Sequence, residues 1–133
     1  MKNTERVGAM YQAFGTGDIP TLLGFLDDNV DWEYTGSYDD LPWYQRRRGK
    51  AGATAFFQSL ADFEFHVFNP TAILDAPGGL VVSLVAIDLT LKRNSARIII
   101  PDEVHLFYFS EAGKVIKFAH RVDTHLFWKA MQT

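Results

Sequence analysis

Two histidines near the end of the chain carry the side chains best suited to proton transfer. One face of the apolar run ending at Ser110 carries Glu103, His105, Phe107 and Phe109, and one face of the last run carries Ile116, Phe118, His120 and Val122. The short turn at Glu111–Gly113 should pair these runs antiparallel and bring His105 and His120 to the same end. A buried imidazole has a lowered pKa and can transfer protons near neutral pH. We therefore predict both histidines as catalytic; the alternative is a pair of core histidines bonded to a backbone carbonyl or a tyrosine.

Glu33 is the third candidate for acid–base chemistry, as a general base. It lies in a short alternating segment, Val30–Tyr34, in which Val30, Trp32 and Tyr34 form the apolar face. This alternation alone turns Glu33 outward. The sequence pattern therefore leaves the orientation of Glu33 open.

Other polar residues have simpler explanations. Two histidines and one carboxylate are a legitimate metal ligand set, but no local His-Glu-x-x-His spacing supports one, so we predict no metal and no cofactor. Arg121 and Asp123 are expected to form a surface pair, and Asp88 is either a cavity polar group or an edge charge. The Arg46–Arg48 run precedes a helix and could bind an anion, but a solvated loop is the simpler expectation.

Composition limits the class of protein. The chain has 133 residues, of which 47% are hydrophobic and 14% aromatic, so one domain spanning residues 1–133 with a buried core is expected. A net charge of −3 gives no reason to expect nucleic acid or an anionic membrane as partner. The sequence has no cysteine, which excludes thiol chemistry. No apolar run approaches a membrane span, and the first residues lack a signal-peptide core, so we expect a cytoplasmic protein.

Hydrophobic periodicity predicts helices first and strands afterwards. The predicted helices are Thr4–Phe14, with Asn3 as N-cap, a second one capped by Asp18 and ended by Asp27–Asn29, and Gly49–Ala61. The predicted strands are Val30–Tyr34, Phe63–Ala76, Gly79–Leu91, Ala96–Ser110 and Lys114–Asp123.

Pro70 predicts an edge position or a bulge for its strand, and Gly79–Leu91 is apolar enough for burial on both faces. The loop Thr35–Arg48 is a possible lid, and Thr124–Met131 a last short helix. The order α-α-β-α-β-β-β-β, with a curved antiparallel sheet, predicts an α+β fold.

Four short motifs give the chain a family resemblance. They are Gly17-Asp18 between the first helices, Asp27, Asp28, Val30 and Trp32 around the first strand, Arg48-Gly49 with Phe56-Phe57 in the third helix, and Phe107, Phe109 and Gly113–Phe118 at the end. This pattern resembles the NTF2-like superfamily, and within it the SnoaL-like and ketosteroid-isomerase-like proteins. The resemblance implies a cone, in which a curled sheet wraps around helices and encloses an apolar pocket. It also implies a homodimer through the outer sheet face. Its members include isomerases, dehydratases, cyclases, hydrolases and non-catalytic proteins, so the fold does not choose an activity.

The resemblance also implies positions for an active site. The ketosteroid isomerase site has an Asp base, with a Tyr and a protonated Asp that bind the oxyanion. Motif matching places the base at Glu33, facing inward, the oxyanion Asp at His105 and the oxyanion Tyr at Met10. Since two of the three positions differ in chemistry, we do not predict ketosteroid isomerase activity. The paired histidines resemble the scytalone-dehydratase branch, in which histidines and water act without a metal.

Two functions remain open. The first is an acid–base enzyme for a small, largely apolar, oxygenated substrate, of the isomerase, dehydratase, cyclase or hydrolase type. The second is a non-catalytic ligand-binding or dimeric interaction module. The predicted pocket wall consists of Tyr11, Phe14, Trp32, Trp43, Phe56, Phe57, Phe107 and Phe118. The predicted partners are a small molecule and a second copy of the chain.

Overall fold

The chain begins with two helices that pack on one side of the sheet. The computed structural model describes residues 1–33 and 41–132, to which all structural statements below refer. Helix α1 spans Asn3–Gly15 and α2 spans Ile19–Leu23. As predicted, Asp18 caps α2, because its side chain accepts a hydrogen bond from the backbone N–H of Thr21 at 3.2 Å. The prediction for α1 was wrong by one residue, since Lys2 and not Asn3 occupies the N-cap position.

Six strands form one curved sheet with the order β2-β1-β6-β5-β4-β3. The strands are β1 (Leu26–Trp32), β2 (Arg47–Arg48), β3 (Phe63–Ala76), β4 (Leu80–Leu91), β5 (Ala96–Phe109) and β6 (Val115–Arg121). Pairing is antiparallel except between β1 and β6, which run parallel. The predicted α+β class is confirmed, with a mostly antiparallel sheet that does not close. The edge position of β3 agrees with the prediction from Pro70.

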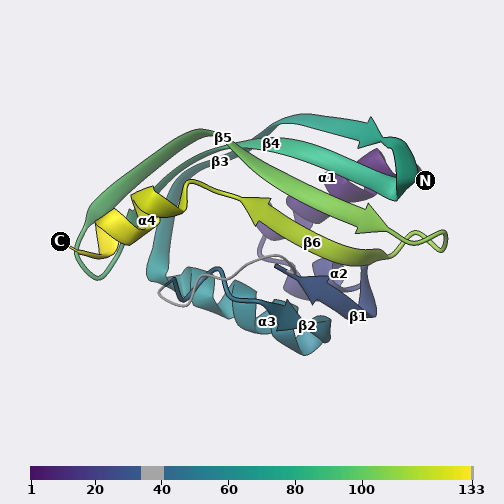
Figure 1. The fold of residues 1–133 in the computed structure, drawn as a ribbon, viewed down its shortest axis with the longest axis horizontal. Helices are drawn as coiled ribbons and strands as arrows, with labels where there is room; N and C mark the ends of the chain where they lie inside the picture. Colours follow the sequence, from purple (N-terminus) through teal and green to yellow (C-terminus); the bar gives the residue numbers. More distant parts are fainter. Residues whose placement is uncertain (34–40, 133) are drawn as a thin grey trace.

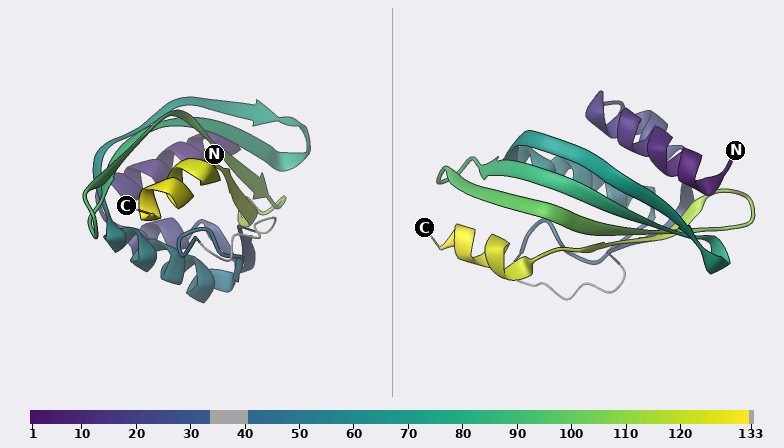
Figure 2. Two further views of the ribbon diagram at one scale, coloured as in Figure 1. Left: turned by 60° about the vertical axis from the view of Figure 1, so that its left-hand side comes forward. Right: turned by 90° about the horizontal axis from the view of Figure 1, so that it is seen from above.

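The sheet curves around the helices (Figure 1, Figure 2). Helix α3 (Gly49–Ser59) continues into the 3₁₀ turn Leu60–Asp62 and lies below the sheet in Figure 1, whereas α1 and α2 lie behind it. Helix α4 (Thr124–Met131) has the predicted bounds and lies across one end of the curved sheet (Figure 2). Within the described part of the chain, no helix is both long enough and apolar enough to cross a bilayer.

Strand β1 differs from its prediction at both ends. It begins at Leu26, so the acidic stretch Asp27–Asn29 lies within the strand and does not end α2. It ends at Trp32, and Glu33 has a positive φ of 57°. A non-glycine residue in this left-handed region breaks the alternation of side chains along a strand. The alternation of Val30 and Trp32 therefore does not extend to Glu33.

The neighbouring long strands β4 and β5 have a concave face and an outer face. On β4, every second residue from Val81 to Leu91 is buried, and the residues between them are only half-buried. In the single chain β4 is therefore buried on one face only, and the burial predicted for its other face, by a second copy of the chain, stays a prediction. On β5, the concave face from Glu103 to Phe109 is buried, as the sequence pattern predicts.

Candidate functional site

A cavity lies between the concave face of the sheet and the helices. The volume that the centre of a water molecule can reach inside this cavity is about 70 Å³. Because one water needs roughly 10–15 Å³ by this measure, the cavity has room for several waters. The lining contains these residues of the predicted wall: Tyr11, Phe14, Trp32, Phe56, Phe57, Phe107 and Phe118. Its polar side chains are few, and they come mainly from β5 and β6.

Trp43 lies outside the cavity lining, contrary to its predicted position. Its side chain is fully buried beside Phe63, with 4.5 Å between ring centroids, and its Nε1 donates to Asp62 Oδ2 at 3.0 Å. The next residue, Tyr44, lines the cavity instead. A loop has no periodicity from which the inward-facing residue could be chosen, so no sequence pattern favoured Tyr44 over Trp43.

The two predicted histidines lie side by side and line the cavity. His105 on β5 and His120 on β6 are directly paired across the antiparallel ladder, and their ring centroids are 4.7 Å apart at an interplanar angle of 89°. Both are almost fully buried, with 3% and 6% exposure. The short turn between the strands sets this register, so the sequence argument brings the correct pair together.

His105 joins Glu103 to a third group, the phenol of Tyr11. His105 Nε2 lies 2.6 Å from Glu103 Oε2, and its Nδ1 lies 2.8 Å from the Tyr11 hydroxyl. Since an ionised carboxylate only accepts hydrogen bonds, Nε2 of neutral His105 carries the proton and Nδ1 accepts from Tyr11. The chain of donors therefore runs from Tyr11 through His105 to Glu103. Among the described residues, Oε1 of Glu103 has no hydrogen-bond partner.

Glu33 points inward, but it stands behind His120 and does not line the cavity. Its side chain is 1% exposed, and Oε1 lies 2.9 Å from His120 Nδ1. The same oxygen accepts a hydrogen bond from the backbone N–H of His120. Because the backbone N–H of Glu33 also donates to the carbonyl oxygen of Phe118 at 2.7 Å, the acid is held against β6 from two sides.

The two imidazoles have opposite electrostatic surroundings. Burial lowers the pKa of His105, and the hydrogen bond and charge of Glu103 only partly offset it. Burial also acts to lower the pKa of His120, but the charges of Glu33 and Glu103 outweigh it, so that pKa is raised. Burial acts to raise the pKa of Glu33, but the charge and hydrogen bonds of His120 outweigh it, so that pKa is lowered. At neutral pH this arrangement favours a neutral His105, and it shifts His120 toward the cationic form.

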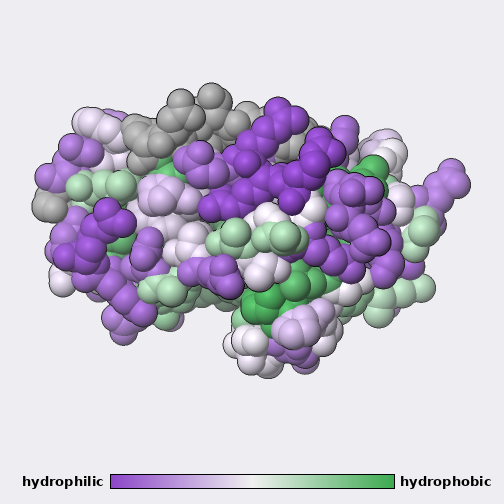
Figure 3. Space-filling model, turned by 90° about the horizontal axis from the view of Figure 1, so that it is seen from below, coloured by the Kyte–Doolittle hydropathy of each residue, from purple (hydrophilic) through white to green (hydrophobic). Residues whose placement is uncertain are grey.

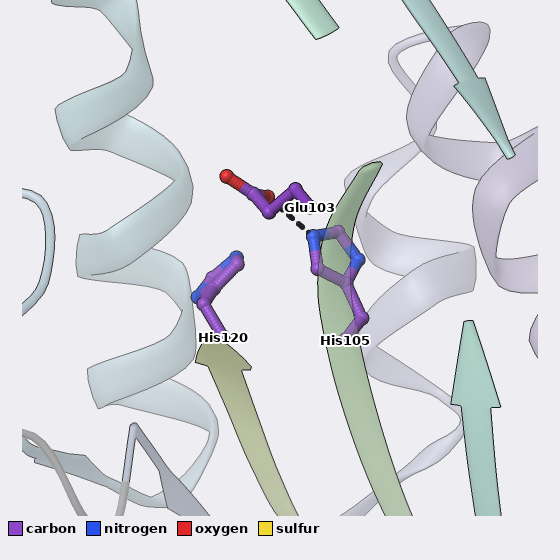
Figure 4. A group of neighbouring side chains, drawn as sticks. All are labelled: Glu103, His105 and His120. Atoms are coloured by element: carbon purple, nitrogen blue, oxygen red, sulfur yellow. Dashed lines mark hydrogen bonds and ion pairs between the residues drawn. The ribbon is translucent and has the colours of Figure 1, made fainter. Parts of the chain in front are cut away.

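Glu103, His105 and His120 have the composition of a metal-ligand set. Their potential ligand atoms all lie within 4.8 Å of one another, and both imidazoles point toward the Glu103 carboxylate (Figure 4). However, His105 and Glu103 are already joined at 2.6 Å, whereas two ligands of one tetrahedral Zn²⁺ ion would lie about 3.3 Å apart. The arrangement is that of a hydrogen-bonded acid–base cluster, with its polar groups on one side of an aromatic cavity.

Two of the other polar candidates form ion pairs elsewhere. Asp88 pairs with Arg97 at 2.6 Å, which makes it a surface charge rather than a cavity group. Arg48 of the basic run pairs with Asp31 at 2.7 Å across β1 and β2. These residues do not contact the acid–base cluster.

Comparison with known protein families identifies one that matches most of the chain. The SnoaL-like domain family matches residues 7–118. The sequence has no significant match among curated proteins.

Solved structures with a similar fold share about a fifth of their residues with this chain. An NTF2-like protein of unknown function from Burkholderia pseudomallei K96243 has a TM-score of 0.83 and 21% identity over 100% of both chains. TerC, co-crystallised with polyporic acid, has a TM-score of 0.75 and 22% identity over 98% of both chains. A proposed polyketide cyclase from Pseudomonas putida KT2440 has a TM-score of 0.74 and 20% identity over 98% of both chains. The chain therefore belongs to the SnoaL-like family of the NTF2-like superfamily.

Proposed function

We propose that the protein is a cofactor-independent acid–base enzyme that acts on a small, largely apolar carbonyl compound. The observation that carries this proposal is the pair of histidines in one cavity whose pKa values are shifted in opposite directions. Titratable neighbours whose surroundings separate their pKa values are the usual mark of an acid and a base that work together. The aromatic lining suits an apolar ligand, and the polar cluster suits an oxygen at one end.

In this proposal Glu103 is the general base. Its Oε2 is held by His105, whose tautomer is fixed by Tyr11, so Oε1 is left to accept a proton from an acidic carbon of the substrate. His120, kept cationic by Glu33, donates a hydrogen bond or a proton to the substrate oxygen. Glu33 is then a positioning residue rather than the base that the resemblance implies.

Structural neighbours support a ligand of this class. TerC was co-crystallised with polyporic acid, and another neighbour is a proposed polyketide cyclase. Since both share only the fold with this chain at their level of identity, they do not select the substrate or the reaction.

The test is proton exchange at carbon, which does not require the natural substrate. β-Tetralone has an acidic carbon next to a ketone and an aromatic body that suits the lining. We expect the protein in D₂O to speed deuterium incorporation into β-tetralone, measured by NMR, well above the buffer rate. The rate should fall as the pH rises through the raised pKa of His120, which is faced by Glu33, Glu103, His105 and Arg121. Saturable binding of β-tetralone without any exchange would favour the non-catalytic binding module.

We also propose that the chain forms a homodimer through the outer face of the sheet. Val82, Leu84 and Leu106 lie half-buried on that face, and Ile99 is 59% exposed. The opposite side, seen from below in Figure 3, is mainly hydrophilic, with its apolar groups in small separate areas. Light scattering at micromolar concentration should give twice the chain mass, and Leu84→Glu should shift it to one chain mass. A wild-type protein that stays monomeric would contradict the proposal.

A further inference from the structure

The carboxylate of Glu103 has no positively charged partner of its own among the described residues. Its side chain is 3% exposed, and Oε2 accepts a hydrogen bond from His105 Nε2. Burial lowers the pKa of His105, so this donor is neutral at neutral pH. Charged groups that are buried in proteins are normally paired with an opposite charge. Glu103 therefore lacks the cation that a buried carboxylate is expected to have beside it.

The positive charge of His120 is already matched by another acid. Its Nδ1 lies 2.9 Å from Glu33 Oε1, so the two side chains together form a neutral ion pair. Arg47 and Arg121 act on this pair through their charges, but neither of them lines the cavity. In the part of the chain that the structure describes, the lining contains no lysine or arginine. The cavity surface therefore keeps the negative charge of Glu103.

The second oxygen of Glu103 is placed to accept a hydrogen bond from a ligand. Oε1 has no hydrogen-bond partner within residues 1–33 and 41–132. In Figure 4 it projects away from His105, whose ring nitrogen is joined by the dashed line to the other carboxylate oxygen. A positively charged N–H group donates a stronger hydrogen bond to a carboxylate than a neutral donor does. An ammonium group would therefore supply both the missing hydrogen bond and the missing charge.

Aromatic rings surround the imidazoles on either side of this carboxylate. The centroid of Phe118 lies 5.6 Å from that of His105 and 4.7 Å from that of His120. Phe56 lies 5.2 Å from His120, and Phe68 lies 6.3 Å from His105. All three phenylalanines line the cavity. The face of an aromatic ring attracts a cation within about 6 Å, and the attraction is stronger where water is excluded.

We propose that the cavity binds a small, largely apolar amine in its protonated form, with an ammonium N–H donating to Glu103 Oε1. The apolar body of the amine lies along the aromatic wall, and its charged end lies among the rings of Phe56, Phe68 and Phe118. Binding of this kind does not require catalysis. Since the amine occupies the oxygen that the proposed function uses as the base, it also blocks proton transfer from β-tetralone.

A pair of ligands with one skeleton tests this proposal at pH 7. 2-Aminotetralin carries an ammonium group at this pH, because an alkylamine is protonated there as a lysine side chain is. 2-Tetralol carries a neutral hydroxyl at the same position. Titration calorimetry should give wild-type protein a dissociation constant about tenfold lower for 2-aminotetralin than for 2-tetralol.

Glu103→Gln should abolish the preference for the amine and leave the affinity for 2-tetralol nearly unchanged. The Tm of the variant should show that it is folded. Glu64→Gln is the matched control, because it removes an acid that is exposed on β3 and does not line the cavity. This control loses the same charge from the protein and should keep the tenfold preference.

The amine site and the proposed enzyme can fail separately. Equal affinity of wild-type protein for the two ligands would overturn the amine site, as would a preference that persists in folded Glu103→Gln. If wild-type protein exchanges β-tetralone but does not prefer the amine, the amine site is overturned while the enzyme proposal stands. If it prefers the amine through Glu103 but does not exchange β-tetralone, the enzyme proposal fails and the amine site stands.

Discussion

Glu103→Gln is expected to lower deuterium exchange into β-tetralone by about 10²–10⁴-fold, the usual loss when a general base is removed. Glutamine keeps the size of the side chain, and its carbonyl oxygen can still accept from His105 Nε2, as the carboxylate does at 2.6 Å. The amide cannot take a proton from carbon. The effect should therefore lie in the turnover number, and binding of β-tetralone should change much less.

Glu64→Gln is the matched control for this prediction. Glu64 is an exposed acid on β3 and does not line the cavity, so its loss should leave exchange unchanged. If Glu103→Gln keeps full activity while His105→Gln loses it, the base is the imidazole and not the carboxylate. Both variants at full activity would contradict the entire cluster assignment.

Glu33→Gln is expected to lower the free energy of unfolding by about 3 kcal/mol near pH 5.5, since it removes one partner of a buried ion pair. Cationic His120 stabilises the folded state. This contribution is complete below the ordinary histidine pKa of 6.5 and is lost as the pH rises through the raised pKa of His120. Ionised Glu33 also stabilises the folded state. This contribution is present above the ordinary pKa of 4.5 and is lost as the pH falls through the lowered pKa of Glu33. The contribution of the pair is therefore largest between these two values.

Urea unfolding at about pH 5.5 and about pH 8.5 tests this prediction. The loss of unfolding free energy in Glu33→Gln should be clearly smaller at the higher pH, because less of His120 is then cationic. Asp28→Asn, which removes an exposed acid 3.4 Å from Lys50, is the control and should show little loss at either pH. An equal loss for Glu33→Gln at both values would show that packing, and not the ion pair, accounts for it.

The sequence predicted the parts of the fold that depend on local patterns. The bounds of β3 and α4 agree with the structure, and the alternation along β5 placed His105 on the concave face. The start of β1 was misread because Asp27–Asn29 looks like a helix end, although this stretch lies within a strand whose residues on either side, Leu26 and Asp31, pair with β6. That parallel pairing joins residues far apart in the sequence, so no local pattern could predict it.

The site was predicted only where strand alternation controls orientation. Glu33 faces inward because of its positive φ, which the polar–apolar pattern does not encode. Glu103 shares a face with His105 in the sequence pattern, but it follows Pro101 and Asp102 and so resembles the end of an apolar run. A carboxylate two residues before a histidine on the same strand face was the signal that could have identified it.

The three side chains of the polar cluster all come from one hairpin, β5–β6, whereas much of the aromatic wall belongs to the helices. The hairpin is held by a continuous backbone ladder, in which His105 and His120 are direct partners. The helices instead contact the cavity through side chains such as Phe14 and Phe57. Substitutions of these two phenylalanines, unlike a substitution of Tyr11 on α1, can therefore reshape the space for a ligand without disturbing the chemistry. In an evolving family, this separation lets substrate range diverge while proton transfer is retained.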